Sequence, residues 1–305
     1  MKKLIQEYIK FFRKQFPYVV RAERIVEKIF SAQGNGFFES RNKKGKLVGL
    51  ALLNKSTILM LAVDKKYQGR GIGSKLLQMA EAQAEKEGWK EINVGAGEFY
   101  LTPGVPTDQK PFDEELKQAN IFDGISNEGE EFFKKKGYSH SWEDANCFDM
   151  FQKLHPLKFD YKVGDTVEGI TFNWAGKEDQ KDVCKCVRYA YPKFGKFYKD
   201  ENLYGADPKA RVLVAKNGDK TVGALIVNIG RDDKKMGSIG CTVVKVSQRG
   251  KHIASNMAII ATNYFRQVGL KTAHLSYTFS GLDVLYGYSG YQICSYYFMG
   301  KKKLN

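Results

Sequence analysis

The stretch YQGRGIGSKLL, residues 67–77, has residue types and a spacing that suggest chemistry. Three alternating glycines leave a bare backbone directly before a segment with helical periodicity. The first N–H groups of a helix attract phosphate, and glycine lets a ligand approach them closely. Four interpretations fit such a loop: a dinucleotide site, a nucleoside triphosphate site, a coenzyme A site, or a turn that binds no ligand.

The spacing of the glycines separates these interpretations. A P-loop needs a Lys-Ser or Lys-Thr pair after its last glycine, and none follows here. A dinucleotide fingerprint needs a third glycine where Ser74 stands, and it must follow the strand directly. The pattern that fits is Gln-x-x-Gly-x-Gly, formed by Gln68, Gly71 and Gly73.

The loop lies in a segment that occurs twice in the chain. The copy VDKKYQGRGIGSKLLQMAEAQAEKEGWKEINV begins at Val63, and VKVSQRGKHIASNMAIIATNYFRQVGLKTAHL begins at Val244, an ungapped offset of 181. Upstream, GKLVGLALL matches DKTVGALIV. We interpret the copies as two related domains in tandem and predict domains over 1–154 and 155–305.

The elements that must position the loop follow the same predicted order in both copies. In the second copy Asn217-Gly218 predicts a hairpin turn, a third strand precedes the loop, and a helix and a further strand follow it. In the first copy Gly88 predicts the end of the helix. The apolar residues of that helix share one face: Ile72, Leu76, Leu77, Ala80 and Ala84.

On this frame, the Gln-x-x-Gly-x-Gly loop resembles the signature of the GCN5-related N-acetyltransferases (GNAT superfamily), which cradles the pyrophosphate of acetyl-CoA. The later family segment Asn-x-x-Ala-x-x-Phe-Tyr-x-x-x-Gly-Phe is similar to SNEGEEFFKKKGY, with Phe133 at the tyrosine position. The second copy keeps Tyr286 in register but has His252 in place of the middle glycine. The resemblance covers nearly the whole chain and implies an α/β (α+β) fold of two tandem GNAT domains, each a mixed central sheet flanked by helices.

The resemblance also implies acetyl-CoA as co-substrate and two sets of binding residues. In the first copy we expect cofactor contacts from Leu61, Ala62, Val63, Gln68, Gly69, Arg70, Gly71, Ile72, Gly73, Ser74 and Phe133. A candidate second cofactor site consists of Val244, Arg249, Gly250, Lys251, Ile253 and Ala254. Because His252 replaces a glycine, we expect the second copy to have lost coenzyme A and to shape the acceptor cleft.

Acetyl transfer from a thioester to an amine needs a neutral amine, hydrogen-bond donors for the oxyanion and a proton for the departing thiolate. The resemblance makes Tyr286 the candidate proton donor, with a packed core tyrosine as the alternative. In the first copy water can protonate the departing thiolate, because a thiol has a pKa of about 8.5. Candidate general bases are Asp64 and Glu98, or else these are ordinary surface carboxylates. His274 is the counterpart in the second copy, or a structural histidine.

The first copy carries an insertion between its last two landmarks. Gly88 to Gly137 spans 49 positions, whereas Gly269 to Gly290 spans 21. The insertion contains the stiff turn Pro103–Pro106, and long loops near sites are often functional. We interpret it as an acceptor-site loop or, alternatively, as a loop that packs between the domains. The expected amine contacts are Tyr100, Asp108 and the acids Asp113–Glu115.

The composition limits which partners, metals and cellular locations are expected. The formal charge of +15 suits an anionic partner, but dispersed lysine runs such as NKKGK favour solvated surface, so no nucleic acid is expected. Five cysteines at unrelated spacings predict no disulfide framework and no metal site, and hence reduced thiols in the cytoplasm. No apolar run has the length of a membrane span, and the N-terminus is typical of an amphipathic helix.

The leading hypothesis is a cytoplasmic N-acetyltransferase that moves an acetyl group from acetyl-CoA to an amine by direct attack on the thioester. The acceptor would be a small molecule or a peptide. One alternative is a non-catalytic acyl-CoA-binding regulatory protein, which Phe133 and His252 favour. The other is an aminoacyl-tRNA-dependent transferase of the peptidoglycan-bridge type, which the intact first loop disfavours.

Overall fold

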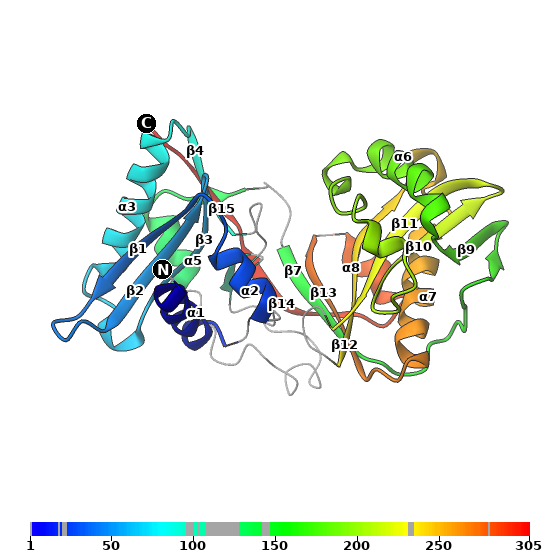
Figure 1. Ribbon diagram of the computed structural model, residues 1–305, viewed down its shortest axis with the longest axis horizontal. Coiled ribbons are helices and arrows are strands. Elements are labelled where there is room, and N and C mark those ends of the chain that lie inside the picture. The colour runs from blue at the N-terminus through cyan, green and yellow to red at the C-terminus, as the bar shows by residue number, and fades with distance from the viewer. Residues whose placement is uncertain are drawn as a thin grey trace. The chain divides into compact units, whose positions relative to one another are not determined.

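The computed structural model describes residues 2–17, 19, 23–95, 101–102, 104–107, 128–141, 147–230, 235–279 and 281–305. Its internal contacts divide the chain into two compact units. Unit 1 is Met1–Phe148 together with Cys294–Asn305, and unit 2 is Asp149–Ile293. The C-terminal segment therefore returns to unit 1, where the red strand β15 lies among blue and cyan elements in Figure 1.

Unit 1 has a six-stranded sheet in the order β1-β2-β3-β4-β15-β6. The pair β3 and β4 is parallel, whereas β15 is antiparallel to both of its neighbours. The strands of this sheet are β1 (Asn35–Arg41), β2 (Leu47–Asn54), β3 (Thr57–Val63), β4 (Glu91–Val94), β6 (Ser139–His140) and β15 (Gly300–Lys303). A further short strand, β5 (Val105–Thr107), pairs with β14 (Gln292–Phe298) instead. The described helices are α1 (Lys2–Gln15), α2 (Glu23–Phe30), α3 (Ile72–Lys86) and α5 (Glu128–Lys135).

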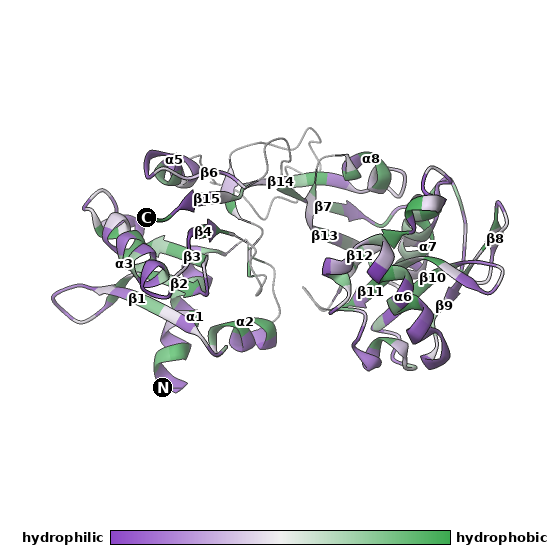
Figure 2. Ribbon diagram, turned by 90° about the horizontal axis from the view of Figure 1, so that it is seen from above, coloured by the Kyte–Doolittle hydropathy of each residue, from purple (hydrophilic) through white to green (hydrophobic). Residues whose placement is uncertain are grey.

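Two apolar clusters in unit 1 explain why its helices pack on the sheet. Helices α1 and α2 contribute buried residues to one cluster with β2 and β3, while α3 and α5 contribute to another. Every residue of β2 is buried, as expected for a strand in the middle of a helix–sheet–helix sandwich. Figure 2 shows both hydrophobic and hydrophilic residues on α1 and α2, the pattern of helices with one face in a core.

Unit 2 repeats this arrangement, with its described strands in the order β7-β13-β12-β11-β10-β9-β8. The strands are β8 (Thr166–Val167), β9 (Ile170–Trp174), β10 (Ala210–Asn217), β11 (Lys220–Ile229), β12 (Met236–Val244) and β13 (Thr272–Phe279). The helices are α6 (Gln180–Ala190), α7 (Ile253–Gln267) and α8 (Leu282–Gly287). The chain passes from one unit to the other within β7 (Cys147–Lys153) and within β14 (Gln292–Phe298).

Corresponding glycines allow the same helix to pack closely in each unit. A Cβ atom on Gly49 of β2 would lie 2.9 Å from the Cγ2 atom of Ile72. A Cβ atom on Gly223 of β11 would lie 3.3 Å from the Cγ2 atom of Ile253. Both contacts are tighter than ordinary van der Waals contact, so the glycines are needed for the approach. The repeat found in the sequence is thus present in the packing.

In each unit, the described residues of the parallel pair next to the loop are joined over the first part of the longer strand. Strand β3 pairs with β4 at Thr57 and Ile58 and then continues to Val63, whereas β4 ends at Val94. Strand β12 pairs with β13 at 236–238 and continues to Val244. A register shift marks a bulge in the neighbouring antiparallel pair in both units. The backbone of β3 and of β12 is therefore left open beside the loop.

The prediction of two α/β domains, each with a mixed sheet flanked by helices, is confirmed. The compact units differ from the predicted ranges 1–154 and 155–305 at both ends of unit 2, because 149–154 belong to unit 2 and 294–305 to unit 1. The reason lies in hydrogen bonding, since β15 fills the gap between β4 and β6. Residues 296–298 of β14 also pair with β5 in unit 1.

Candidate functional site

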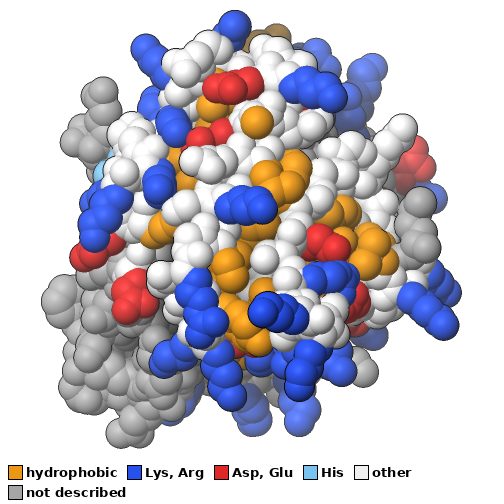
Figure 3. Space-filling model, turned by 90° about the vertical axis from the view of Figure 1, so that its left-hand side faces the viewer, with side chains coloured by type: hydrophobic (Ala, Val, Ile, Leu, Met, Phe, Trp, Pro, Cys, Tyr) orange, Lys and Arg blue, Asp and Glu red, His pale blue; other side chains and the backbone are white. Residues whose placement is uncertain are grey.

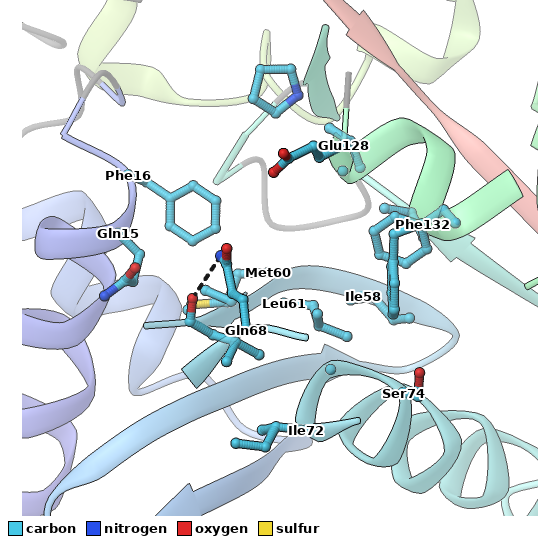
Figure 4. A pocket seen from close by; sticks show the side chains of 18 of the residues that line it. Gln15, Phe16, Ile58, Met60, Leu61, Gln68, Ile72, Ser74, Glu128 and Phe132 are labelled. Atoms are coloured by element: carbon cyan, nitrogen blue, oxygen red, sulfur yellow. Dashed lines mark hydrogen bonds between the residues drawn. The ribbon is translucent and has the colours of Figure 1, made fainter. Parts of the chain in front are cut away.

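A cavity of about 620 Å³ in unit 1, here called pocket 1, lies where β3 separates from β4. Its floor is β3 from Ile58 to Val63, and the loop 67–74 closes one end. Figure 4 shows Ile72 and Ser74 at that end and Glu128 on the opposite side of the pocket. Pocket 1 thus connects the glycine loop with a separate polar end.

Two conformational features shape the loop of pocket 1. The Gln68 side chain donates from Nε2 to the Val63 carbonyl oxygen at 3.0 Å, which fastens the loop to the end of β3. Gly69 and Gly71 have φ angles of 72° and 77°, a left-handed conformation that favours glycine. Because Gly71 precedes the first turn of α3, the free N–H groups of that turn are available to an anion.

Space beside the loop also fits a bulky anionic group. A Cβ atom added at Gly69 or Gly71 would meet no heavy atom within 4 Å. Figure 3 shows many lysine and arginine side chains on the face of the molecule that carries α3. The exposed cations near the loop in sequence, or in the β1–β2 turn, are Lys43, Lys44, Lys46, Lys65, Lys66, Arg70 and Lys75. A hydrogen bond of 2.9 Å from Asn42 to the Tyr67 hydroxyl joins that turn to the loop. The field at this end of the pocket therefore attracts anions.

The structure brings together nearly all of the expected first set of cofactor residues. Arg70 is the exception, because its guanidinium lies 5.3 Å from the Tyr67 ring centre and donates to the Lys66 carbonyl oxygen instead of lining the pocket. The other members line pocket 1: Leu61, Ala62, Val63, Gln68, Gly69, Gly71, Ile72, Gly73, Ser74 and Phe133. The expected set did not include several other lining residues, among them Gln15, Phe16, Thr102, Glu128 and Phe132.

Phe132 and Phe133 form the aromatic wall of pocket 1. Phe133 is buried, and its ring packs edge-on against Phe132 and Tyr138. Phe132 faces the loop, since a Cβ atom on Gly73 would lie 3.6 Å from its ring (Figure 4). Neither ring carries a hydroxyl, so this wall cannot supply a proton.

The structure places Asp64 in a capping and ion-pairing role. Its carboxylate accepts hydrogen bonds from the Lys66 N–H at 3.2 Å and from the Lys14 Nζ at 2.6 Å. The hydrogen bond from Lys14 lowers the pKa of Asp64 below its ordinary value, and the Lys66 N–H acts in the same direction. A carboxylate stabilised in its charged form is a weaker base, so this geometry does not favour Asp64 as the proton acceptor. Glu98, Tyr100, Asp108 and Asp113–Glu115 lie outside the described residues.

We expect Asp64→Asn to reduce stability slightly and to leave turnover unchanged. A lowered folded-state pKa means that the carboxylate contributes stability above its unfolded pKa of about 3.9, and that this contribution is lost as the pH falls through the folded pKa. The ion pair involves an exposed lysine and contributes at most about 1 kcal/mol. Denaturant unfolding of wild type and variant at pH 7 and pH 3 measures the difference, with Lys14→Gln as the matched partner. A large fall in turnover at unchanged stability would instead identify Asp64 as the base.

A second cavity of about 610 Å³, here called pocket 2, occupies the corresponding place in unit 2. Arg249 stands where Gln68 stands in unit 1, and its Nε donates to the Val244 carbonyl oxygen at 3.4 Å. His252 precedes α7 with a φ angle of 52°, so it keeps the left-handed conformation that glycine has in unit 1. For histidine this conformation is strained by about 1–2 kcal/mol. The loop shape is therefore retained despite the histidine.

The structure also brings together most of the candidate second set. Val244, Arg249, Gly250, Ile253 and Ala254 line pocket 2, together with His252. Lys251 does not line it, because its Nζ donates to the Gln248 side chain at 3.0 Å.

Tyr286 lies in the wall of pocket 2 and is largely buried. Its hydroxyl donates to the Thr242 Oγ1 at 3.0 Å, on the open part of β12. Burial raises the pKa of Tyr286 above its ordinary value, while the bond with Thr242 acts in the opposite direction. The phenol therefore stays neutral at physiological pH and keeps its proton. His274 is buried away from the pocket lining, with its Nε2 3.5 Å from the Asp149 carboxylate.

The part of the chain that the structure describes contains neither a cluster of metal-binding side chains nor a membrane-spanning helix. We find no group of three or more His, Cys, Asp or Glu side chains that could hold a metal ion there. Over the same residues, no helix combines the length and the apolar character needed to cross a membrane.

Comparison with protein families gives a match for each unit. The model described as acetyltransferase (GNAT) domain matches residues 4–103, and the model described as acetyltransferase (GNAT) family matches residues 180–281. The two matches contain the loop of pocket 1 and the loop of pocket 2. No curated protein sequence matches the chain significantly.

Solved structures with the same fold cover the whole chain. A glucosamine N-acetyltransferase region of a fungal multi-domain GH3 β-N-acetylglucosaminidase has a TM-score of 0.74 at 20% identity, over 99% of this chain and 36% of that chain. A GCN5-related N-acetyltransferase from Sphaerobacter thermophilus has a TM-score of 0.63 at 15% identity, over 94% and 90%. A tandem GNAT protein from the clavulanic acid biosynthesis pathway has a TM-score of 0.64 at 14% identity, over 100% and 96%. At such identities the likeness concerns the fold.

Proposed function

The chain belongs to the GNAT superfamily and carries two GNAT domains in tandem, and from this premise we propose that it transfers an acetyl group from acetyl-CoA to the amine of a small molecule or peptide. The observation that carries the proposal is the loop of pocket 1. Gln68 fastens it to β3, Gly71 turns it directly before the first turn of α3, and the space beside Gly69 and Gly71 is open. Such a site binds a pyrophosphate.

The unpaired side of β3 suits the pantetheine part of acetyl-CoA. Beyond Ile58, β3 has no described partner on its β4 side, so its backbone groups are available to an extended pantetheine arm. The N–H groups of this strand are also the candidate donors for the oxyanion that forms on the thioester carbonyl. Pocket 1 continues to an end where Glu128 is the one charged residue among the described lining residues. A carboxylate at that end, away from the phosphate loop, would draw a cationic amine into the site.

The transfer itself is a direct attack. The nitrogen of the neutral amine forms a bond with the thioester carbonyl carbon, the carbon–sulfur bond breaks, and the amine loses a proton to a base or to water. The sulfur takes a proton in return. In pocket 2 we assign this donation to Tyr286, whose buried phenol is neutral and lines the cavity. In pocket 1 Phe133 occupies the equivalent place, and water must protonate the sulfur there.

We expect Tyr286→Phe to lower the kcat of transfer in pocket 2 by about 100-fold, at the low end of the range for general acid–base catalysis, because a thiolate is already a tolerable leaving group. The KM for acetyl-CoA should not change, since the ring remains. Steady-state kinetics with varied acetyl-CoA measures both constants.

Tyr264→Phe is the matched control for that variant. The Tyr264 hydroxyl donates to the Pro208 carbonyl oxygen at 3.0 Å in the same unit and does not line the pocket, so its loss should leave turnover unchanged. Equal kinetics for Tyr286→Phe and the wild type would contradict the assigned role.

A second candidate function is non-catalytic binding of acyl-CoA by unit 1. The buried Phe133 favours it, because the aromatic wall of pocket 1 lacks a proton donor. Incubation of the full chain with acetyl-CoA and a panel of amines separates the two functions. The panel includes glucosamine, which one of the similar structures is named for, together with a polyamine, an amino acid and a peptide. Release of free thiol with an acetylated amine supports transfer, and binding without release supports the regulatory function.

A further inference from the structure

The two ends of pocket 2 differ in polarity. At the loop end it carries Arg249 and His252, which suit phosphate. The part of the lining that lies outside the loop, the start of α7 and β12 consists of Ala190, Tyr191, Phe194, Phe279, Leu282, Leu285 and Tyr286. No charged side chain occurs among these described residues, and their only polar side-chain groups are the hydroxyls of Tyr191 and Tyr286. This end is therefore an apolar and aromatic surface.

The aromatic wall is held in place by its local structure. Tyr191 follows the last residue of α6 and keeps a hydrogen bond of 2.8 Å from its N–H to the Val187 carbonyl oxygen. Pro192 begins the 3-10 turn η3 (Pro192–Phe194) directly afterwards, which fixes the backbone. The rings of Tyr191 and Phe194 meet edge-to-face with centroids 4.5 Å apart, and Phe194 packs on the core of unit 2. The wall is thus built before a ligand arrives.

Part of this apolar surface is left in contact with water. Tyr191 is 42% exposed and Leu282 is 39% exposed, although both line the cavity. Large apolar side chains gain free energy when a ligand removes their surface from water. The exposure at a pocket mouth therefore favours a ligand that is itself apolar on this side.

The corresponding end of pocket 1 is different. Pocket 1 also has an aromatic wall, Phe132 and Phe133, but its outer end adds Gln15, Thr102 and the Glu128 carboxylate beside the ring of Phe16. Because the two units share the strand, loop and helix frame, the frame does not impose the uncharged outer end of pocket 2. The difference lies in side chains that line the cavity, and these are the side chains that a ligand would contact.

We propose that pocket 2 takes a substrate with a hydrophobic group, an aliphatic chain of several carbons or an aromatic ring, which lies against Tyr191, Phe194 and Phe279. The inference rests on the proposed function and adds a substrate class to its second site. The hydrophobic group belongs either to the acyl part of the thioester or to the body of the amine. The chemistry of recognition is the same in both cases, and the bonds that form and break are those of the transfer described above.

Two substrate series test the proposal on the full chain. The first is a set of saturated acyl-CoA thioesters from acetyl to octanoyl, with dissociation constants measured by calorimetry. The second is a set of primary alkyl amines of the same lengths, with acetyl-CoA fixed and KM for the amine measured. We expect affinity to rise about fourfold for each added methylene in one of the two series, until the apolar end is full. The series that shows the rise identifies the source of the group.

Variants test whether the increase of affinity with chain length comes from pocket 2. Tyr191→Ser and Phe194→Ala should flatten the dependence on chain length while acetyl-CoA binding persists. Tyr189→Ala is the control, because Tyr189 lies on α6 near these residues but is 70% exposed and does not line the cavity. Tyr191→Ser keeps the test valid if Phe194→Ala fails to fold, since Tyr191 is already partly exposed.

Each outcome has a distinct meaning. A flat dependence in both series, with thiol release intact, overturns the hydrophobic substrate class and leaves the transferase function standing. If affinity still increases with chain length in both Tyr191→Ser and Phe194→Ala, the assignment to pocket 2 is overturned. Absence of any thioester binding overturns the proposed function itself.

Discussion

Replacing Gly71 with glutamate should lower the affinity for acetyl-CoA by at least about 100-fold. Gly71 has a φ angle of 77°, which costs a residue with a side chain about 1–2 kcal/mol. The new carboxylate would also lie at the anion-binding end of pocket 1, where two like charges about 4 Å apart repel by about 4 kcal/mol at an effective dielectric constant of 20. The strain is the same with and without ligand and affects folding stability, but a 100-fold loss of affinity needs only about 2.8 kcal/mol, which the repulsion alone exceeds. Calorimetric titration with acetyl-CoA measures the change.

Gly34→Glu is the matched control for that variant. Gly34 has a φ angle of 81°, an added Cβ atom there meets nothing within 4 Å, and the residue does not line pocket 1. The control therefore introduces the same charge and the same backbone strain in unit 1 away from the site. If Gly71→Glu binds acetyl-CoA as the wild type does, the phosphate group is not held at this loop.

Ending the chain at Phe298 should prevent unit 1 from folding stably. The deletion removes β15, an interior strand between β4 and β6, and leaves their facing backbone groups without partners. It also removes the Lys302–Glu81 ion pair of 2.9 Å and the bond from the Ser141 N–H to the Met299 carbonyl oxygen. With several backbone hydrogen bonds worth about 1 kcal/mol each and further buried surface lost, we expect a loss on the order of 5 kcal/mol. Such a loss is a large part of the stability of a typical domain, about 5–15 kcal/mol.

Scanning calorimetry with limited proteolysis distinguishes the two units in this experiment. Unit 1 should lose its transition and become sensitive to protease, and acetyl-CoA binding at pocket 1 should disappear with it. Deleting only Leu304 and Asn305 is the control, because β15 ends at Lys303 and remains intact. An unchanged transition for the chain that ends at Phe298 would mean that unit 1 is stable without its last strand.

Much of the lining at the loop end of pocket 1 could be predicted because its signal is local. Gln68, Gly71 and Gly73 lie within six residues, and the structure gives them the roles that such a spacing requires: a bond to the preceding strand, a left-handed turn and the start of a helix. The second loop was found from the repeat alone. The expectation that His252 had removed coenzyme A binding stays untested, although the loop keeps its shape and its cavity.

The residues at the far ends of the pockets carried no such signal. Gln15 and Phe16 lie about fifty positions before the loop, and their place in the lining depends on how α1 packs on β2 and β3. Glu128 was part of the family segment, but its position across from the loop depends on how α5 packs. Tyr191 and Phe194 belong to a short turn whose sequence predicts no cavity. Contacts of this kind depend on side chains brought together from distant segments, which periodicity and spacing do not encode.

By itself, the sequence determined the duplication, the α/β order of each half, and the bare turn at the start of α3. These follow from residues close together in the chain, through backbone conformation and the 3.6-residue period of a helix. Only the tertiary structure decided that the last strand completes unit 1, that Lys14 holds Asp64, and that one pocket ends in a carboxylate and the other in aromatic rings. The physical reason is that burial and hydrogen bonding of distant segments are settled by the free energy of the whole fold, where many weak contacts compete.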